Sequence, residues 1–333
     1  MSVKRIIISR TDSIGDVMLT LPMCVWLKKN IPDVELIYLG KNYTKPVVDC
    51  FSVIDEFVDW SRIETLPTSQ RIEALHELHA SAIIHVFPNK EIATLAKKAK
   101  IPMRVGTSHR TFHLLTCSHR LNFTRKSSPL HESQLNFELL RPFGLIDIPS
   151  LESISEMVSA FQPKDVVLPA TVLEKLSAAS KTVVLHPKSQ GSAVEWPIKS
   201  YVELAIKLAD TGYTVFFTGT EKEGELFRKD LPINPSIIDL SGTMSLEQLI
   251  VFIGRVQNLV ACSTGPLHIA GFLGVRTIGL FSPRKPIHPG RWQALGSNVS
   301  ILVNDPECPT CKKKKACDCI QLISVERVLG EIA

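Results

Sequence analysis

The feature that most constrains the fold is a repeated alternation of short apolar runs with segments of helical periodicity. In the first half, apolar runs at 5–10, 34–40 and 81–88 are separated by segments such as 16–30, whose apolar residues recur at helical spacing. Apolar runs that alternate with helices indicate buried parallel strands joined by crossover helices. The pattern therefore predicts an α/β fold with doubly wound parallel sheets.

The alternation stops near residue 165 and then starts again. The segment 161–181 contains two prolines and resembles a connector with a short helix, and strands are expected after it, at 182–186, 213–219, 237–242, 258–263 and 276–283. A length of 333 residues fits two domains. We expect three parts: a first domain over 1–165, a second over 166–315, and a helical tail over 316–333 that packs back on the first domain.

Composition and hydropathy limit the class and the location of the protein. Hydrophobic residues make up 44% and charged residues 21%, which excludes a disordered chain. No apolar run approaches the roughly 18 residues that span a bilayer. The first apolar run is soon followed by charged and turn residues, unlike a signal peptide. We therefore expect a cytoplasmic protein.

The loops that follow the strands are the candidate site, because ligands of open parallel sheets bind at the carboxyl ends of the strands. The first loop, SRTDSIGD, places Gly15 in a turn and Asp16 in the first turn of a helix. A carboxylate there can serve as a general base, or can simply stabilise the helix N-terminus. Asp12 is the second candidate. The loop has no G-x-G-x-x-G, which argues against a dinucleotide site.

Three loops of the second half suit a nucleotide. The loop 187–195 combines a lysine with serines and a glycine, which suits a diphosphate but also an ordinary flexible turn. The turn at 263–265 leads into a helix that carries His268, and its amides suit a phosphate leaving group, although a packed histidine is the alternative. Glu221 or Glu223 is placed to accept hydrogen bonds from ribose hydroxyls.

Two further clusters need an explanation. The stretch from Lys90 to Lys126 contains nine Lys and Arg residues against one acid, which indicates an anionic partner or a solvated basic face. Near the end of the chain, four of the eight cysteines form a C-x2-C-x5-C-x-C cluster: Cys308, Cys311, Cys317 and Cys319. Four thiolates can hold a structural zinc ion, whereas disulfides are disfavoured in a reducing cytosol.

Taken in order, several motifs resemble the ADP-heptose–lipopolysaccharide heptosyltransferases of glycosyltransferase family 9. They are SIGDVMLTLP, RVGTSHR, HESQLNFELLRPFGL, EWP, GTMSLEQL and STGPLHIAGFLGVRTIGLF, and the ordered set covers nearly the whole chain. The resemblance implies the GT-B architecture, in which two Rossmann-like domains face each other across a cleft. In that family the first domain takes the acceptor and the second takes the nucleotide sugar.

The resemblance also implies roles for individual residues. It makes Asp16 the general base of an inverting, metal-independent heptosyl transfer from ADP-heptose. The donor-binding residues on this interpretation are Lys188, Ser189, Glu223, Met244, Leu246, Ser263, Thr264, Gly265 and His268. The acceptor-binding residues are Ser13, Gly15, Arg104, Arg110 and Arg120. The arginines would bind an anionic lipopolysaccharide core at the inner leaflet, which implies a peripheral protein on the cytoplasmic face.

The chain departs from the family pattern at two positions. Ser263 stands where the family usually has Asp, and Val194 stands where Lys is common, so Lys188 is the candidate for the missing cation. The nucleotide and the sugar therefore stay open. The alternatives are transfer of another nucleotide-activated hexose to a surface glycan and a nicotinamide-dependent oxidoreductase. A nucleic-acid-binding module leaves the strand–loop–helix sites unexplained, so no nucleic-acid partner is expected.

Overall fold

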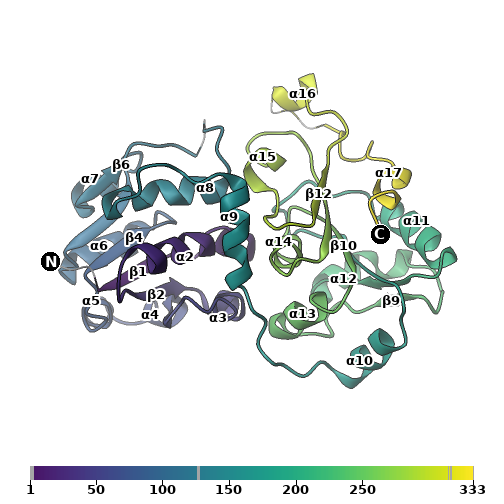
Figure 1. Ribbon diagram of the computed structural model, residues 1–333, viewed down its shortest axis with the longest axis horizontal. Helices are drawn as coiled ribbons and strands as arrows, with labels where there is room; N and C mark the ends of the chain where they lie inside the picture. Colours follow the sequence, from purple (N-terminus) through teal and green to yellow (C-terminus); the bar gives the residue numbers. More distant parts are fainter. Residues whose placement is uncertain (1–3, 126–127, 314, 316, 333) are drawn as a thin grey trace. The chain divides into compact units, whose positions relative to one another are not determined.

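The computed structural model describes residues 4–125, 128–313, 315 and 317–332, which form two compact units, Met1–Gln162 and Pro163–Ala333 (Figure 1). Each unit contains one six-stranded sheet, and every pairing between neighbouring strands is parallel. Helices flank both sheets (Figure 1). The predicted α/β class with doubly wound parallel sheets is therefore confirmed.

The first sheet has the strand order β3-β2-β1-β4-β5-β6. Its strands are β1 (Arg5–Ser9), β2 (Glu35–Gly40), β3 (Glu56–Asp59), β4 (Ala82–His85), β5 (Met103–Thr107) and β6 (His119–Leu121). Ile7 in β1 is in register with Ile37 on one side and Ile83 on the other. The strand order reverses between β1 and β4, and the loops that leave the carboxyl ends of these strands part there to leave a crevice.

The helices of the first unit pack against the two faces of this sheet. They are α1 (Ile14–Met18), α2 (Leu21–Asn30), η1 (Asn42–Thr44), α3 (Lys45–Asp49), α4 (Trp60–Ile63), α5 (Thr68–His76), α6 (Lys90–Lys98), α7 (Thr111–Thr116), α8 (Glu132–Phe137), η2 (Glu138–Phe143), α9 (Leu151–Met157) and η3 (Val158–Ala160). On one face, Ile7 and Ile83 belong to a core with Leu75 of α5 and Ile92 of α6.

One expected helix is divided. The sequence predicts a single helix over 16–30, whereas the structure has α1 and α2 with a break at Leu19 and Thr20. Pro22 lies in the first turn of α2 and has no N–H group to continue a helix from α1. The Thr20 hydroxyl donates instead to the Asp16 carbonyl at 2.9 Å. The break leaves Asp16 on a helix of its own.

The second sheet repeats the first. Its order is β12-β11-β10-β7-β8-β9, which is the same sequence of crossovers as in the first sheet. The strands are β7 (Thr182–His186), β8 (Thr214–Phe217), β9 (Ile237–Asp239), β10 (Asn258–Cys262), β11 (Arg276–Leu280) and β12 (Val299–Leu302). The order reverses between β7 and β10, so the loops 187–196 and 263–265 leave the sheet at its crevice.

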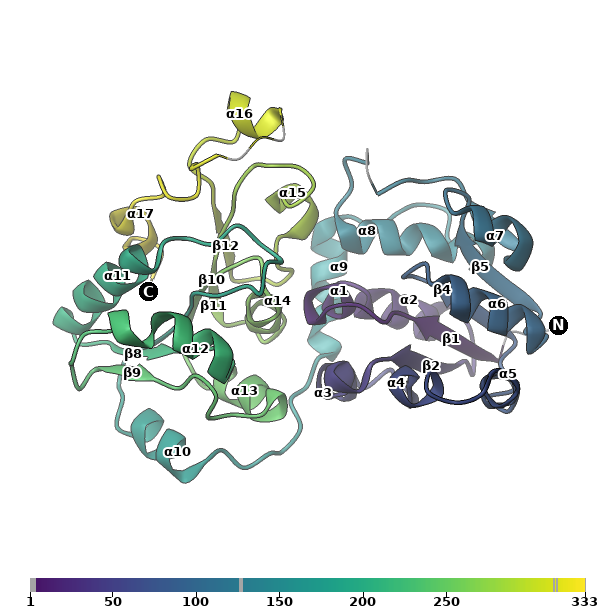
Figure 2. The ribbon, with the colours of Figure 1, turned by 180° about the vertical axis from the view of Figure 1, so that it is seen from behind.

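The helices of the second unit include the last part of the chain. They are α10 (Ala170–Ser177), α11 (Ile198–Asp210), α12 (Glu221–Phe227), η4 (Arg228–Asp230), α13 (Leu246–Ile253), α14 (Gly265–Phe272), α15 (Pro289–Trp292), α16 (Pro309–Lys312) and α17 (Val325–Leu329). In both views α17 lies beside α11 (Figures 1 and 2). Across the part of the chain that the structure describes, no helix has the length and apolar character of a bilayer span.

The C-terminal segment is part of the second unit. Ile320, Ile323, Val325 and Val328 are buried in the same core as the strands of the second sheet. The Trp196 indole donates to the Ile323 carbonyl at 3.0 Å, deep in this core. This placement differs from the expectation of a tail that packs back on the first domain, because these four apolar side chains fill the core beside Trp196.

Candidate functional site

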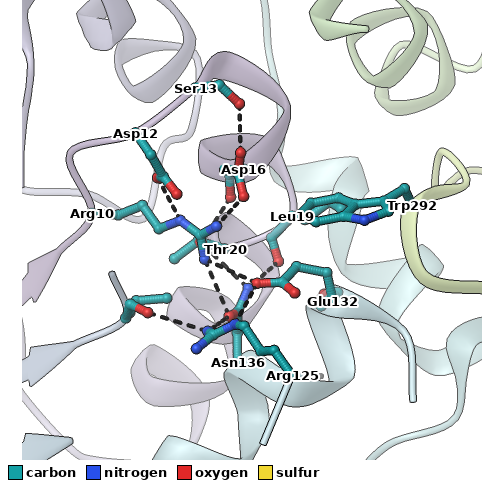
Figure 3. A network of polar contacts seen from close by, with 12 residues as sticks. Arg10, Asp12, Ser13, Asp16, Leu19, Thr20, Arg125, Glu132, Asn136 and Trp292 are labelled. Carbon is teal, nitrogen blue, oxygen red and sulfur yellow. Dashed lines mark hydrogen bonds and ion pairs between the residues drawn. The ribbon is translucent and has the colours of Figure 1, made fainter. Parts of the chain in front are cut away.

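A buried arginine organises the loop after β1. Arg10 directly follows the strand at the crevice of the first sheet and is 2% exposed. Its guanidinium donates to Asp12 at 2.7 Å, to Asp16, and to Glu132 at 3.3 Å (Figure 3). One cation therefore joins three carboxylates from two distant segments of the chain.

A second arginine supports this cluster from the side of α8. Arg125 donates to Glu132 at 2.8 Å and to the Asn136 side-chain oxygen at 3.0 Å (Figure 3). The Asn136 amide group donates to the Leu19 carbonyl at 3.0 Å, just before α2 begins. Glu132 and Asn136 thus tie α8 to the α1–α2 break that carries Asp16.

The charges of this network do not balance. Two guanidinium groups face three carboxylates in a nearly buried setting. Burial raises the pKa of Asp12 to about 6, more than Arg10 lowers it, and the neighbouring Asp16 adds repulsion. Burial by itself would lower the pKa of Arg10, but the three carboxylates outweigh it and raise that pKa. The raised pKa means that Asp12 can take up a proton near pH 6.

The raised pKa of Asp12 predicts a pH-dependent stability. The pKa is about 6 in the folded protein and 3.8 ordinarily, so the unfolded chain loses this proton first as pH rises. The stability that Asp12 contributes is therefore present below about pH 4 and lost as pH passes 6. In Asp12→Asn this titration is absent. Relative to wild type, the free energy of unfolding of the variant should rise by about 1–3 kcal/mol between pH 4 and pH 7.

Urea denaturation at several pH values measures this difference. Asp33→Asn is the matched control, because Asp33 is exposed and its backbone has φ of 55°, which Asn tolerates. The difference in free energy of unfolding between Asp33→Asn and the wild type should not change with pH. A pH-independent difference in free energy of unfolding between Asp12→Asn and the wild type would contradict the raised pKa of Asp12.

Asp16 has a fixed orientation. It lies in the first turn of α1, and its side chain is 19% exposed. One carboxylate oxygen accepts from Arg10, and the other accepts from the Ser13 hydroxyl (Figure 3). Gly15 lies between these residues in α1. The carboxylate is thus held by a donor on each oxygen while a part of it stays open to solvent.

The three arginines expected at the acceptor are not brought together. Arg104 donates from Nε to the Thr116 carbonyl at 2.6 Å and lies near the amino end of β5. Arg120 donates to the Cys117 carbonyl at 3.1 Å. Arg110 is exposed and follows the carboxyl end of β5, the sheet edge from which the Asp16 loop also leaves. Lys126 of the basic stretch is outside the described residues.

In the second unit, a carboxylate shapes the loop after β7. Glu195 accepts from the Lys188 ammonium at 2.5 Å, and its other oxygen accepts from the Ser189 amide at 2.8 Å and hydroxyl at 2.9 Å. Burial raises the pKa of Glu195, but the Lys188 ammonium and the Ser189 donors together outweigh burial and hold that pKa below its ordinary value. The loop is therefore an ordered turn with a cation beside the crevice.

The turn after β10 lies next to this loop. The Ser192 hydroxyl donates to the Ser263 carbonyl at 3.4 Å, so the two loops meet at the reversal of strand order. Thr264 is the N-cap of α14 but makes no capping hydrogen bond, and its hydroxyl is buried without a hydrogen-bond partner among the described residues. Gly265 opens the helix. The Gly265 and Leu267 amides have no acceptor within the helix and can bind an anion, whereas Pro266 has no N–H group.

The remaining residues that are expected to bind the nucleotide sugar have different surroundings. His268 is buried in α14, 2% exposed. Glu223 closes a capping box at α12, where one of its oxygens accepts from the Thr220 amide at 2.7 Å and hydroxyl at 2.9 Å. Met244 and Leu246 are half-buried at the start of α13, so each keeps some apolar surface for a flat ring.

Five residues of these networks were not expected as site residues from the sequence: Arg10, Arg125, Glu132, Asn136 and Glu195. A signal for Arg10 exists, since a charged residue directly after a buried strand must find a partner. Glu132 and Asn136 lie four residues apart in the HESQLN motif, a spacing that places both on one helix face. Glu195 belongs to the EWP motif, but its contact with Lys188 needs the folded loop.

Comparison with known proteins identifies the family. Residues 72–320 match the family model glycosyltransferase family 9 (heptosyltransferase). A Haemophilus influenzae protein described as a glycosyltransferase is 25% identical, and the match covers 99% of this chain and 96% of the relative. Lipooligosaccharide heptosyltransferase 2 of the same organism is 25% identical, with 82% of each chain covered.

Two solved structures share the fold. Escherichia coli ADP-heptose lipopolysaccharide heptosyltransferase II has a TM-score of 0.75 at 18% identity and covers 98% of this chain and 97% of its own. E. coli heptosyltransferase WaaC, solved with ADP-2-deoxy-2-fluoro heptose, has a TM-score of 0.70 at 17% identity, with 97% of each chain covered. The neighbours have the GT-B fold expected from the sequence, and the family model spans most of the chain. The chain belongs to glycosyltransferase family 9, the heptosyltransferase family.

Proposed function

We propose that the chain is an inverting transferase that moves a heptose from ADP-heptose to a lipopolysaccharide core acceptor, with Asp16 as the general base. The observation that carries the proposal is the setting of Asp16 at the carboxyl edge of the first sheet, where Arg10 and Ser13 hold its carboxylate. A general base needs such a fixed and partly open position. Ser13 and Gly15, in the same loop, would then contact the acceptor sugar.

The reaction step follows from this assignment. An acceptor hydroxyl gives its proton to Asp16 as its oxygen forms a bond to the anomeric carbon of the donor. The bond between that carbon and the β-phosphate oxygen breaks on the opposite face, so the configuration inverts. ADP leaves with the electron pair of that bond. Arg10 keeps Asp16 oriented throughout, because its guanidinium is itself held by Asp12 and Glu132.

The second unit would stabilise the leaving group. Negative charge grows on the diphosphate, and amides at a helix N-terminus together with an ammonium group offset it. The uncapped start of α14 at Thr264 and Gly265 supplies the amides, and Lys188 supplies the cation. These groups take the part that a metal ion plays in other transferases, so we propose a metal-independent reaction.

The solved neighbours support ADP-heptose as the donor. WaaC was solved with an ADP-heptose analogue, and heptosyltransferase II is named for ADP-heptose. In this chain, Met244 and Leu246 would contact the adenine. The Glu223 carboxylate oxygen that takes no part in the capping box would accept a hydrogen bond from the ribose. Ser189, Ser263 and His268 would line the phosphates.

An anionic acceptor at a membrane surface fits the first unit. Helix α7 carries Leu114 and Leu115, which are 55% and 76% exposed, within the basic stretch. Exposed leucines beside cations suit the headgroup region of an anionic leaflet. We propose that the enzyme works as a cytoplasmic, peripheral protein on the inner membrane, with Arg110 nearest to the acceptor edge.

Nucleotide binding tests the donor assignment. Thermal shift and calorimetry with ADP, UDP, GDP and NAD⁺ should show selective stabilisation by ADP. Lys188→Met should weaken ADP binding by roughly 10-fold, about 1.4 kcal/mol, because it removes one charge-assisted contact. Lys175→Met is the control, since Lys175 is exposed on α10 in the same unit. Stronger binding of NAD⁺ than of ADP would favour the oxidoreductase.

A second candidate is a transferase for another nucleotide-activated hexose. Ser263 favours this candidate, because the position usually carries Asp in the family. A neutral side chain next to the phosphate-binding turn changes the charge that the nucleotide-sugar donor contacts. Turnover on truncated lipopolysaccharide cores with a panel of nucleotide sugars separates the two. Product formation with ADP-heptose alone supports the first candidate.

A further inference from the structure

Four cysteine sulfurs gather in one small cluster in the second unit. The Sγ atoms of Cys308, Cys311, Cys317 and Cys319 all lie within 4.8 Å of one another. The Sγ atoms of Cys308 and Cys317 are 3.5 Å apart, and those of Cys317 and Cys319 are 3.1 Å apart. All four cysteines are free thiols. This cluster takes no part in the proposed transfer reaction.

The spacing of the sulfurs matches a tetrahedral metal site. A zinc ion bound to four thiolates at about 2.3 Å places the sulfurs about 3.8 Å apart, within the range that the cluster spans. Cys308, Cys311 and Cys319 are buried, and Cys317 is half-buried. Buried thiols that converge on one point and do not pair as disulfides are typical of a structural metal site.

The backbone presents the sulfurs in the manner of a metal knuckle. Cys308 is the N-cap of α16, and Cys311 lies in the single turn of that helix. The Lys312 amide donates to the Cys308 carbonyl at 3.0 Å, which closes the turn. The turn brings the first two sulfurs to one side, and the chain then returns with Cys317 and Cys319.

The surroundings of the cluster suit a tetrathiolate. Four thiolates and one divalent ion leave two negative charges, and the sequence supplies four consecutive lysines, 312–315, between the second and third cysteines. The Ser282 hydroxyl lies 3.6 Å from Cys311 Sγ in a buried position, where it can donate to the thiolate. Such second contacts orient metal ligands and favour the charged form.

The cluster also joins parts of the second unit that are far apart in sequence. Ser282 comes soon after β11, and Ile320, directly after Cys319, enters the core of the unit. Three residues further on, the Ile323 carbonyl holds the indole of Trp196, next to Glu195 of the Lys188 loop. A metal ion at the cluster would therefore fix the segment that supports the phosphate loop.

We propose that Cys308, Cys311, Cys317 and Cys319 bind one zinc ion with a structural role, and that this ion anchors the segment behind Trp196. Iron is the other metal that four thiolates commonly take, and elemental analysis distinguishes the two. The ion has no contact with the reacting groups in this proposal. It acts by ordering the C-terminal part of the core.

Metal analysis of the purified full-length protein is the direct test. Plasma mass spectrometry should find about one zinc per chain in the wild type and much less in Cys311→Ser and Cys319→Ser. Cys50→Ser is the matched control, because Cys50 is equally buried but lies in the first unit, outside the cluster. It should keep the zinc. One iron per chain in place of zinc would overturn the zinc assignment.

A second measurement remains decisive when a cysteine variant fails to fold. Zinc is removed from the folded wild type with a chelator, and Co²⁺ is added in its place. Intense visible bands of tetrahedral cobalt with thiolate charge transfer should appear, and chelation should lower the melting temperature by several degrees. No metal in the wild type, no cobalt spectrum and an unchanged melting temperature would overturn the site. ADP selectivity and Asp16 dependence test the transferase separately.

Discussion

Asp16→Asn should lower kcat by about 10²–10⁴-fold while leaving the affinity for ADP nearly unchanged. The amide cannot take the proton of the acceptor hydroxyl, yet it keeps the shape of the carboxylate. Its oxygen can still accept from Arg10, and its NH2 group can donate to the Ser13 hydroxyl oxygen. The nucleotide contacts proposed here all come from the second unit, so the donor should still bind. Initial rates with ADP-heptose and a truncated core, together with ADP calorimetry, measure the two effects.

Asp33→Asn provides the comparison for this experiment. It makes the same chemical change in the same unit at an exposed position, so its kcat should equal that of the wild type. Asp12→Asn separates the two acids of the loop, because it keeps the Arg10 contact but removes the charge beside Asp16. Near-native turnover in Asp16→Asn with a large loss in Asp12→Asn would move the base to Asp12.

Arg10→Met should destabilise the first unit by about 3–5 kcal/mol, the cost of leaving buried carboxylates without their cation. The guanidinium is buried and contacts three acids, of which Glu132 is 1% exposed. Methionine fills similar space without charge, so the loss reports electrostatics more than packing. Below about pH 4 the loss should shrink, because protonated carboxyls no longer repel one another. Urea denaturation followed by circular dichroism measures both effects.

Arg228→Met is the matched substitution for this prediction. Arg228 also contacts two acids, Glu221 and Asp239, but its side chain is 43% exposed, so solvent screens the charges that it leaves behind. Its effect on stability should be much smaller. Equal losses in the two variants would show that the Arg10 network contributes no more than an exposed ion pair.

Local patterns predicted the central strands well. The apolar runs at 5–10, 34–40 and 81–88 correspond to β1, β2 and β4, because strands buried on both faces are apolar throughout. β5 and β6 lie inside the basic stretch and were not expected as strands. Arginine and histidine at exposed or half-exposed positions of these outer strands interrupt the apolar signal. The local pattern of this stretch therefore indicates charge and does not reveal β5 and β6.

The site residues expected from the sequence lie in loops that a local pattern can reveal. Asp16 and Thr264 each follow a strand and begin a helix, and this arrangement is visible within about ten residues of sequence. The contact of Arg10 with Glu132 joins residues 122 positions apart. Helix α8 packs against α2 and carries Glu132, and no local pattern encodes that packing.

The second core is completed by residues that are synthesised late, and this order affects how the protein can fold during synthesis. These residues are Ile320, Ile323, Val325 and Val328. All contacts that define the first sheet lie before residue 163, so that unit can fold on the ribosome while the rest is still being translated. The core beside Trp196 has to wait until these four residues have emerged from the exit tunnel. Until then, a nearly complete parallel sheet with an open apolar face is exposed to chaperones and proteases.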